Sequence, residues 1–304
     1  MSETDKRSSS WLKLGCLGVL GAVALLAVWA VAVVGAASIR ARNEVIESRT
    51  LSRPIPRARE PSGTPVGRVV LNFTVGDFRV VRGEPGDPVT VEASFDRRSY
   101  ALHESFDPRN DSGWTYRVTF EETNWFKDGG LRGLLGGSFP KIVVSLPPDV
   151  PLALEGTFGK GHAAFDLGGL WLTDVDLSFD SGAMELRVDQ PLVAPVERIA
   201  IRSRRGATLL RSLGNASPRI LEIDHRMGGL MVDLGGQWVR DADIRIASSM
   251  GGGRLSLPDG VIIEGLPNQP LAAVPAAPPE VPLPTLRISI SSLLGRMDVV
   301  GPDR

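Results

Sequence analysis

The sequence predicts an all-β fold, a β-solenoid or stacked β-strand repeat of about 22–24 residues per unit, preceded by one N-terminal transmembrane α-helix. Three observations predict it. A long apolar stretch without charge lies near the N-terminus, glycines return at a nearly constant spacing, and apolar residues alternate on both sides of these glycines. The composition agrees, because 34 glycines and 23 prolines in 304 residues indicate a turn-rich chain rather than a helical bundle.

Residues 14–39 carry no charge and are bounded by Lys13 and Arg40. A helix needs about 20 apolar residues to cross the ~30 Å hydrocarbon layer of a bilayer, so this stretch is long enough to span it. The alternative is a cleaved signal peptide, since residues 35–38 are small like those of a cleavage site. The apolar run exceeds the roughly 7–15 residues of a signal core, which favours a retained helix.

Basic residues lie on both sides of residues 14–39, so the positive-inside rule favours neither orientation. Long domains translocate largely regardless of such charges. We expect residues 1–13 to be a cytoplasmic tail, and the bulk of a single-pass protein of the cytoplasmic membrane to be periplasmic or extracellular. The reverse orientation would give a cytoplasmic scaffold resembling bactofilins.

Two proline-rich segments flank or interrupt the remaining chain. Residues 40–66 contain Arg, Ser and Pro without helical or strand periodicity, which predicts an extended linker. Residues 267–284 are rich in proline, which donates no ladder hydrogen bond, so we expect a loop there. Residues 67–304 are then the β-repeat domain, with a second, glycine-rich loop at about 125–139.

Glycines at regular intervals carry the main signal of a repeat. Gly159, Gly182, Gly206, Gly228 and Gly251 are spaced 23, 24, 22 and 23 residues apart, and Gly295 follows after 44. Gly76 has similar flanks far upstream. Positions seven, five and three residues before each glycine, and two, four and six after it, tend to be apolar or small. Around Gly182 these positions hold Val175, Leu177, Phe179, Met184, Leu186 and Val188.

Period-two alternation predicts a strand with one buried face on each side of the glycine. The glycine marks a turn or bulge, because a residue without Cβ adopts conformations that others avoid. One unit cannot cover its own apolar face, so several units must stack and share a core. An ordinary β-sandwich with regularly spaced turns is the alternative. The segment 67–150 is less regular, with strand-like alternation at 89–95, 116–120 and 142–146.

The stretch from Ile142 to Gly159, followed by strand–glycine units such as Ile244 to Gly251, resembles the bacterial putative-adhesin domain of unknown function. This family is related to cell-wall-active antibiotic response proteins. The resemblance covers roughly residues 67–301 and rests on the pattern more than on diagnostic residues. It implies a right-handed β-solenoid-like fold, an N-terminal membrane anchor and an envelope location, and it carries no established chemistry.

Charge and cysteine content exclude some function classes. A net charge of −1, from 34 basic and 35 acidic residues, gives no electrostatic reason to expect a nucleic-acid partner. Cys16 is the single cysteine, so neither an intramolecular disulfide nor a thiolate metal cluster can form.

A stacked β-fold can be a carbohydrate-active enzyme when carboxylates converge on one outer face. Six residues before the glycines, the outward column reads Ala153, Asp176, Ala200, Glu222, Arg245 and Ser289, and three residues after them it reads His162, Glu185, Leu209, Met231, Arg254 and Asp298. Neither column predicts adjacent carboxylates for acid–base or glycosidic chemistry. Asp174, Asp176 and Asp180 lie close in sequence as an acid–base or cation-binding alternative, but a solvated strand face explains them equally well.

Other motifs for chemistry are weak. His103, His162 and His225 are far apart and lack metal-ligand spacing, and His225 is expected to be a partly buried, hydrogen-bonded histidine. No Gly-x-Ser-x-Gly motif is present. The sequence therefore predicts no catalytic, cofactor-binding or metal-binding residue and no cofactor.

We expect a non-catalytic, membrane-anchored envelope protein whose β-solenoid is a binding, adhesin-like or structural module. Its partner would be an envelope protein or a polysaccharide. A regulatory component of an envelope-stress response is the alternative, and a carbohydrate-active enzyme is a third hypothesis.

Overall fold

The computed structural model describes residues 45–56, 66–110, 113–123, 139–266 and 282–301. The predicted membrane helix, 14–39, lies outside these residues, as do most of the two predicted loops at 125–139 and 267–284. Among the described residues, no helix has the length and apolar character that crossing a membrane requires.

The described chain is all-β, as predicted, and its strands form one open, 13-stranded sheet. The strands are β1 Ile46–Arg53, β2 Val66–Arg82, β3 Val89–Asp96, β4 Tyr100–Asn110, β5 Gly113–Glu122, β6 Lys141–Leu146, β7 Leu152–Asp166, β8 Leu172–Arg187, β9 Arg198–Arg211, β10 Ile220–Asp233, β11 Ala242–Ser256, β12 Ile262–Glu264 and β13 Thr285–Val300. One short 3₁₀ helix, Leu213–Ala216, follows β9.

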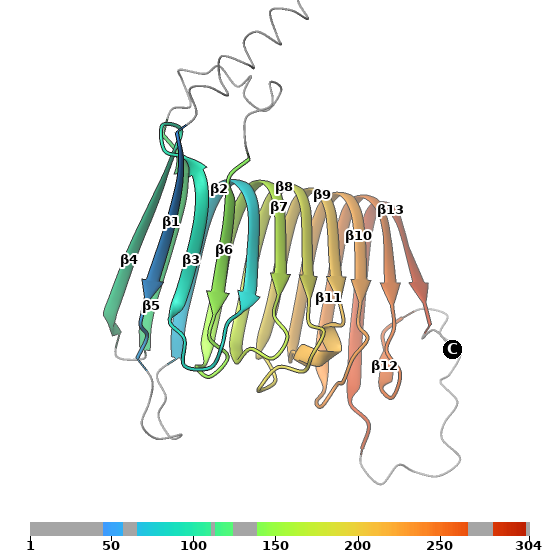
Figure 1. Cartoon of the computed structure of the whole chain (residues 1–304). Coiled ribbons are helices and arrows are strands. Elements are labelled where there is room, and N and C mark those ends of the chain that lie inside the picture. The colour runs from blue at the N-terminus through green and yellow to red at the C-terminus, as the bar shows by residue number, and fades with distance from the viewer. Residues whose placement is uncertain (1–44, 57–65, 111–112, 124–138, 267–281, 302–304) are drawn as a thin grey trace, which may run out of the picture. The chain divides into compact units, whose positions relative to one another are not determined.

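Each long strand bends within its length, and the bends line up along one side of the folded sheet (Figure 1). The bent strands are β2, β7, β8, β9, β10, β11 and β13. In β8 the buried residues before the bend include Leu177 and Phe179, and those after it include Met184 and Leu186. The alternation thus changes phase at Gly182, as the spacing of apolar residues in the sequence predicts. Because β8 folds back at Gly182, both halves of the strand bury side chains in the same interior.

Successive bent strands pair in parallel and in register. The register aligns a column of glycines, hereafter the arc glycines: Gly76, Gly161, Gly182, Gly206, Gly228, Gly251 and Gly295. The prediction that the repeat units lie side by side is confirmed. The prediction of Gly159 as a member of this column is wrong, because Gly161 pairs with both Gly76 and Gly182.

Glycine is required in this column for two reasons. The arc glycines have φ between 118° and 150°, a region that L-residues rarely adopt. In addition, a Cβ on Gly182 would lie 2.0 Å from the carbonyl oxygen of Gly161, and Gly206 and Gly228 are equally crowded by the preceding arc glycine. The backbones of neighbouring arcs therefore approach each other closely enough to leave no space for a side chain.

Side chains from the two halves of one strand meet inside the stack. The rings of Phe73 and Phe78, on either side of Gly76, have centroids 5.2 Å apart, and those of Phe158 and Phe165 are 5.1 Å apart. Ser203 accepts a hydrogen bond from Thr208 at 2.9 Å across the arc of β9. The interior thus changes from aromatic near β2 and β7 to polar beneath the arc of β9.

Antiparallel strands extend the N-terminal end of the stack. β1 pairs with β3, β3 with β6, and β4 with β5. β1 lies within the predicted linker 40–66, so the linker prediction does not hold for residues 46–53. One layer therefore contains β1, β3 and β6, and the other contains β4 and β5. The rings of Phe95 of β3 and Phe120 of β5 have centroids 5.3 Å apart, so these two layers pack face to face.

The final long strand, β13, pairs with β11 along its length and with β12 only over Thr285–Arg287. Among the described residues, the remainder of β13 has no strand on its outer edge. Its inward residues Met297 and Val299 are accordingly more exposed than their counterparts Leu230 and Val232 in β10.

A candidate binding surface on the outer face

The outward side chains that precede the arc glycines form one continuous surface, which we call the first face. They occupy even positions before each glycine, because successive residues of a strand point to opposite sides. Parallel pairing in register stacks equivalent residues in columns, and neighbouring residues within a column are about 4.8 Å apart. A residue type on one strand is therefore next to its counterpart on the neighbouring strands.

Ion pairs between neighbouring strands cross the first face. Glu155 of β7 pairs with Arg68 of β2 at 2.8 Å, and Glu222 of β10 pairs with Arg198 of β9 at 3.0 Å and with Arg245 of β11 at 3.4 Å. Each of these charges is partly exposed, so each pair stabilises the fold by at most about 1 kcal/mol. Their main consequence is that the face presents fixed, alternating charges.

Carboxylates are closer together on this face than the sequence indicated. Glu155, rather than Ala153, occupies the column of Asp176, because the arc glycine of β7 is Gly161. The expectation that no adjacent carboxylates exist in this column is therefore wrong. Burial raises the pKa of the nearby Asp174, with smaller contributions from the charges of Asp176 and Glu155, while the charge of Arg198 lowers it.

Arginines compensate these carboxylates. Asp176 accepts hydrogen bonds from Arg202 and, at 3.3 Å, from Arg198. Asp174 and Asp176 share a face of β8 as expected, while Asp180 lies apart, at the level of the arc, and pairs with Arg204 at 3.1 Å and Arg205 at 3.4 Å. The three aspartates therefore do not form one site.

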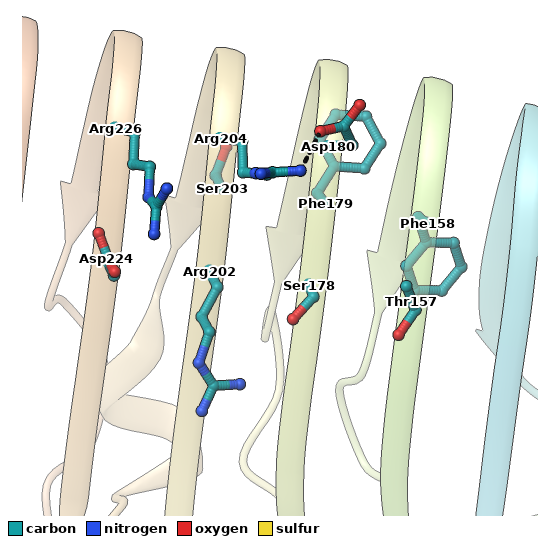
Figure 2. A pocket seen from close by; sticks show the side chains of 10 residues that line it. All are labelled: Thr157, Phe158, Ser178, Phe179, Asp180, Arg202, Ser203, Arg204, Asp224 and Arg226. Atoms are coloured by element: carbon teal, nitrogen blue, oxygen red, sulfur yellow. Dashed lines mark hydrogen bonds and ion pairs between the residues drawn. The ribbon is translucent and has the colours of Figure 1, made fainter.

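An open hollow of about 320 Å³ lies on the first face near the arcs. Figure 2 shows its lining side chains on four neighbouring strands, β7 to β10. One column runs across these strands and contains Thr157, Ser178, Arg202 and Asp224. Asp180, Arg204 and Arg226 line the side next to the arcs, and Phe158, Phe179 and Ser203 lie behind them.

The arginines of the hollow differ in their pairing. Arg204 is held by Asp180, as the dashed line in Figure 2 marks, and Arg202 by Asp176. Arg226 is exposed and forms no ion pair with any described residue. Its guanidinium is therefore the group in this hollow most readily available to an anionic ligand.

The three histidines lie on different strands, as their separation in sequence predicted. His103 of β4 is 3.7 Å from Glu121, and His162 of β7 is 3.3 Å from Asp77. His225 is fully buried and lies 3.4 Å from the Thr208 hydroxyl, but its Nε2 has no hydrogen-bond partner in the structure. The expected hydrogen bonding is therefore met at Nδ1 but not at Nε2 among the described residues, and the side chain is more deeply buried than expected. Burial lowers the pKa of His225, against weaker opposing effects of the Gly228 backbone and Asp224.

The hollow was not predicted from the sequence. The two outward columns considered there lie six residues before and three residues after the glycines, whereas the polar residues of the hollow lie four and two residues before them. The recurrence of Arg202, Arg204 and Arg226 at these positions was the signal that could have found it. Across the part of the chain that the structure describes, no group of His, Cys, Asp and Glu side chains could hold a metal ion.

Comparisons with known proteins give structural matches alone. No family model matches the chain, and no curated protein matches it. A putative cell adhesion protein from Clostridium sporogenes is 11% identical, with a TM-score of 0.38 over 84% of this chain and 100% of its own. A putative adhesin from Bacteroides fragilis is 10% identical, with a TM-score of 0.32 over 84% and 97%.

A protein described as a putative lipid binding protein, from Parabacteroides distasonis, is 11% identical with a TM-score of 0.22 over 84% of this chain and 96% of its own. These structural neighbours are mainly bacterial putative adhesins, which is the description that the resemblance in sequence predicted. No function is transferred from them to this chain.

Proposed function

We propose that this chain is a non-catalytic, membrane-anchored envelope protein. Its stacked, bent strands form a β-solenoid-type module that binds an acidic polysaccharide. The helix predicted at residues 14–39 anchors it in the cytoplasmic membrane, and the bulk of the chain lies outside. The hollow on the first face is the binding site.

One observation carries this proposal: the column Thr157, Ser178, Arg202 and Asp224 crosses four strands in an open hollow. Small-molecule sites are usually concave and bury most of their ligand. A polar column at a spacing of about 4.8 Å instead suits an extended polymer, which contacts successive strands in the same way.

The charges and hydroxyls of the hollow favour a sugar polymer with carboxylates. A guanidinium matches the planar geometry of a carboxylate and stays charged at any physiological pH. Arg226 has no competing acidic partner among the described residues, while the Thr157 and Ser178 hydroxyls can donate to and accept from sugar hydroxyls.

A binding role is favoured over catalysis because the adjacent carboxylates are already engaged. Glu155 is paired with Arg68, and Asp176 is paired with Arg198 and Arg202. A general acid or nucleophile for glycoside hydrolysis has to reach the scissile bond. In their present geometry these carboxylates are directed to arginines of neighbouring strands.

The test is binding of the full-length protein, in detergent micelles, to a polyuronate. Arg226→Ala should weaken binding roughly fivefold, the loss expected for about 1 kcal/mol of a partly exposed charge interaction. Arg79→Ala is the matched control, since Arg79 is an exposed arginine of β2 on the other side of its arc and has no ion pair among the described residues. Equal effects of the two variants, or no binding at all, would contradict the proposed site.

A further inference from the structure

Apolar side chains are exposed along the bend of the last three long strands. Met227, Met250 and Leu294 each precede an arc glycine, and their exposed fractions are 44%, 38% and 64%. Leu293 is 79% exposed. Met227 pairs with Met250 and Met250 with Leu294, so these three side chains form one row. Together with Leu293, Arg205 and Arg296 they make up what we call the arc ridge.

The arc ridge cannot be absorbed into the core. The position two residues before Met227 belongs to His225, which already fills the interior beneath the arc, and Ser248 does the same before Met250. The chain reverses at the following glycine, so the residue next to it points away from both layers. Its apolar side chains therefore remain available to something outside the stack.

The charge around this row is basic. Arg205 and Arg226 lie on the two strands that lead into it, and Arg296, which pairs with Asp298 at 2.7 Å, follows the arc glycine of β13. Asp180, the acidic residue at this level on β8, is paired with Arg204 and Arg205. On β10, β11 and β13 no acidic residue occupies the two positions before the arc glycine or the one after it.

The described chain begins on the side of the stack that carries the arc glycines. Ser48 of β1 pairs with Ser94, Ser94 with Lys141, and Lys141 with Asp77, the residue that follows the arc glycine Gly76. Figure 1 likewise shows β1 starting on the side where the long strands bend. The predicted membrane span ends at Ile39, and the residues between it and β1 can extend over at most about 20 Å. The proposed anchor would therefore tether the arc side of the stack close to the bilayer.

We propose that the arc ridge lies on the anionic phospholipid surface of the membrane that anchors the chain. This inference rests on the anchoring in the proposed function. Leu293, Leu294 and the two methionines enter the boundary between headgroups and acyl chains, and Arg205 and Arg296 bind lipid phosphates. Apolar side chains bordered by basic ones are the combination that binds such interfaces.

The geometry gives the domain two attachment points. Seven strand spacings of about 4.8 Å place Met227 roughly 34 Å from β1, so the tether and the ridge lie at different places along the stack. The long axis of the stack then runs parallel to the bilayer. The ridge contact can be weak by itself, because the tether keeps it at a high effective concentration.

The test uses the full chain, reconstituted in liposomes of neutral and anionic phospholipids. Met227→Cys, in a Cys16→Ser background, carries an environment-sensitive fluorophore. Val193→Cys is the matched control, because Val193 is 58% exposed and lies in the β8–β9 connection, on the side of the stack away from the arc glycines. Lipids brominated in their acyl chains should quench the label at position 227 at least twofold more than the label at 193. Arg205→Ala should reduce this quenching.

The outcomes separate the two proposals. If alkaline carbonate releases the chain from the liposomes, the anchoring itself fails. If the chain stays embedded but the labels at 227 and 193 are quenched equally, the ridge contact is overturned while anchoring stands. Shielding of the 227 label that appears in detergent and grows with protein concentration would show that a second copy covers the ridge, which also overturns the proposal.

Discussion

Replacing an arc glycine should destabilise the fold far more than replacing the glycine beside it. Gly228 and Gly229 are adjacent in β10, yet their surroundings differ. Gly228 has φ 125°, and a Cβ added to it would lie 1.9 Å from the carbonyl oxygen of Gly206. A Cβ added to Gly229 would meet nothing within 4 Å.

The magnitude follows from these two environments. An L-residue held in such a region of backbone space costs about 1–3 kcal/mol, and the contact with a backbone oxygen forces the two arcs apart at a further cost. Gly228→Ala should therefore lower the free energy of unfolding by roughly 2–4 kcal/mol. Gly229→Ala should leave it unchanged or raise it by about 0.4–1 kcal/mol, because alanine restricts the unfolded chain.

Urea denaturation of the full chain in detergent, followed by tryptophan fluorescence, measures both variants against the parent. Trp171 and Trp238 lie in the stack and report its loss. Equal midpoints for Gly228→Ala and Gly229→Ala would refute the reasoning that close approach of neighbouring backbones fixes the arc.

Two further predictions concern buried polar groups. Burial lowers the pKa of His225 in the folded state, so the unfolded state binds a proton more readily. The contribution of His225 to stability should therefore be constant above about pH 6.5 and fall as the pH drops below it. His225→Gln should flatten this fall in denaturation midpoints measured between about pH 8 and 5. Tyr116 donates a hydrogen bond to Glu104 at 2.8 Å, and burial together with this bond raises its pKa. Tyr116→Phe should cost about 1 kcal/mol of unfolding free energy, whereas a midpoint equal to the parent's would show that the bond contributes nothing.

The repeat could be predicted from sequence because each unit must satisfy the same two constraints. Its strands bury alternate residues, and its bend needs glycine. The exception at Gly159 has a physical reason. Moving the arc glycine from 159 to 161 shifts the register by two residues, which leaves every side chain on the same face. Apolar or small residues therefore occupy the inward positions in either case, and the pairing with Gly76 and Gly182 identifies Gly161 as the arc glycine.

β1 could not be predicted because it shows almost no alternation. Leu51 is buried while most of its neighbours are exposed, since the strand lies at the edge of the sheet. The arc ridge was missed for a related reason. Met227 and Leu294 lie where the alternation changes phase, so a period-two pattern predicts neither face for them. The hollow was missed because its members come from four strands and meet only through the register.

Disulfide cross-linking of neighbouring bent strands tests their stacking most directly. Ala183 of β8 pairs with Ala207 of β9, which in turn pairs with Gly229 of β10. In a Cys16→Ser background, Ala183→Cys with Ala207→Cys should form a disulfide under mild oxidation, because one strand spacing of about 4.8 Å suits its geometry. Ala183→Cys with Gly229→Cys, two spacings apart, should not. A disulfide in the second pair, or none in the first, would contradict the parallel stacking of successive units in register.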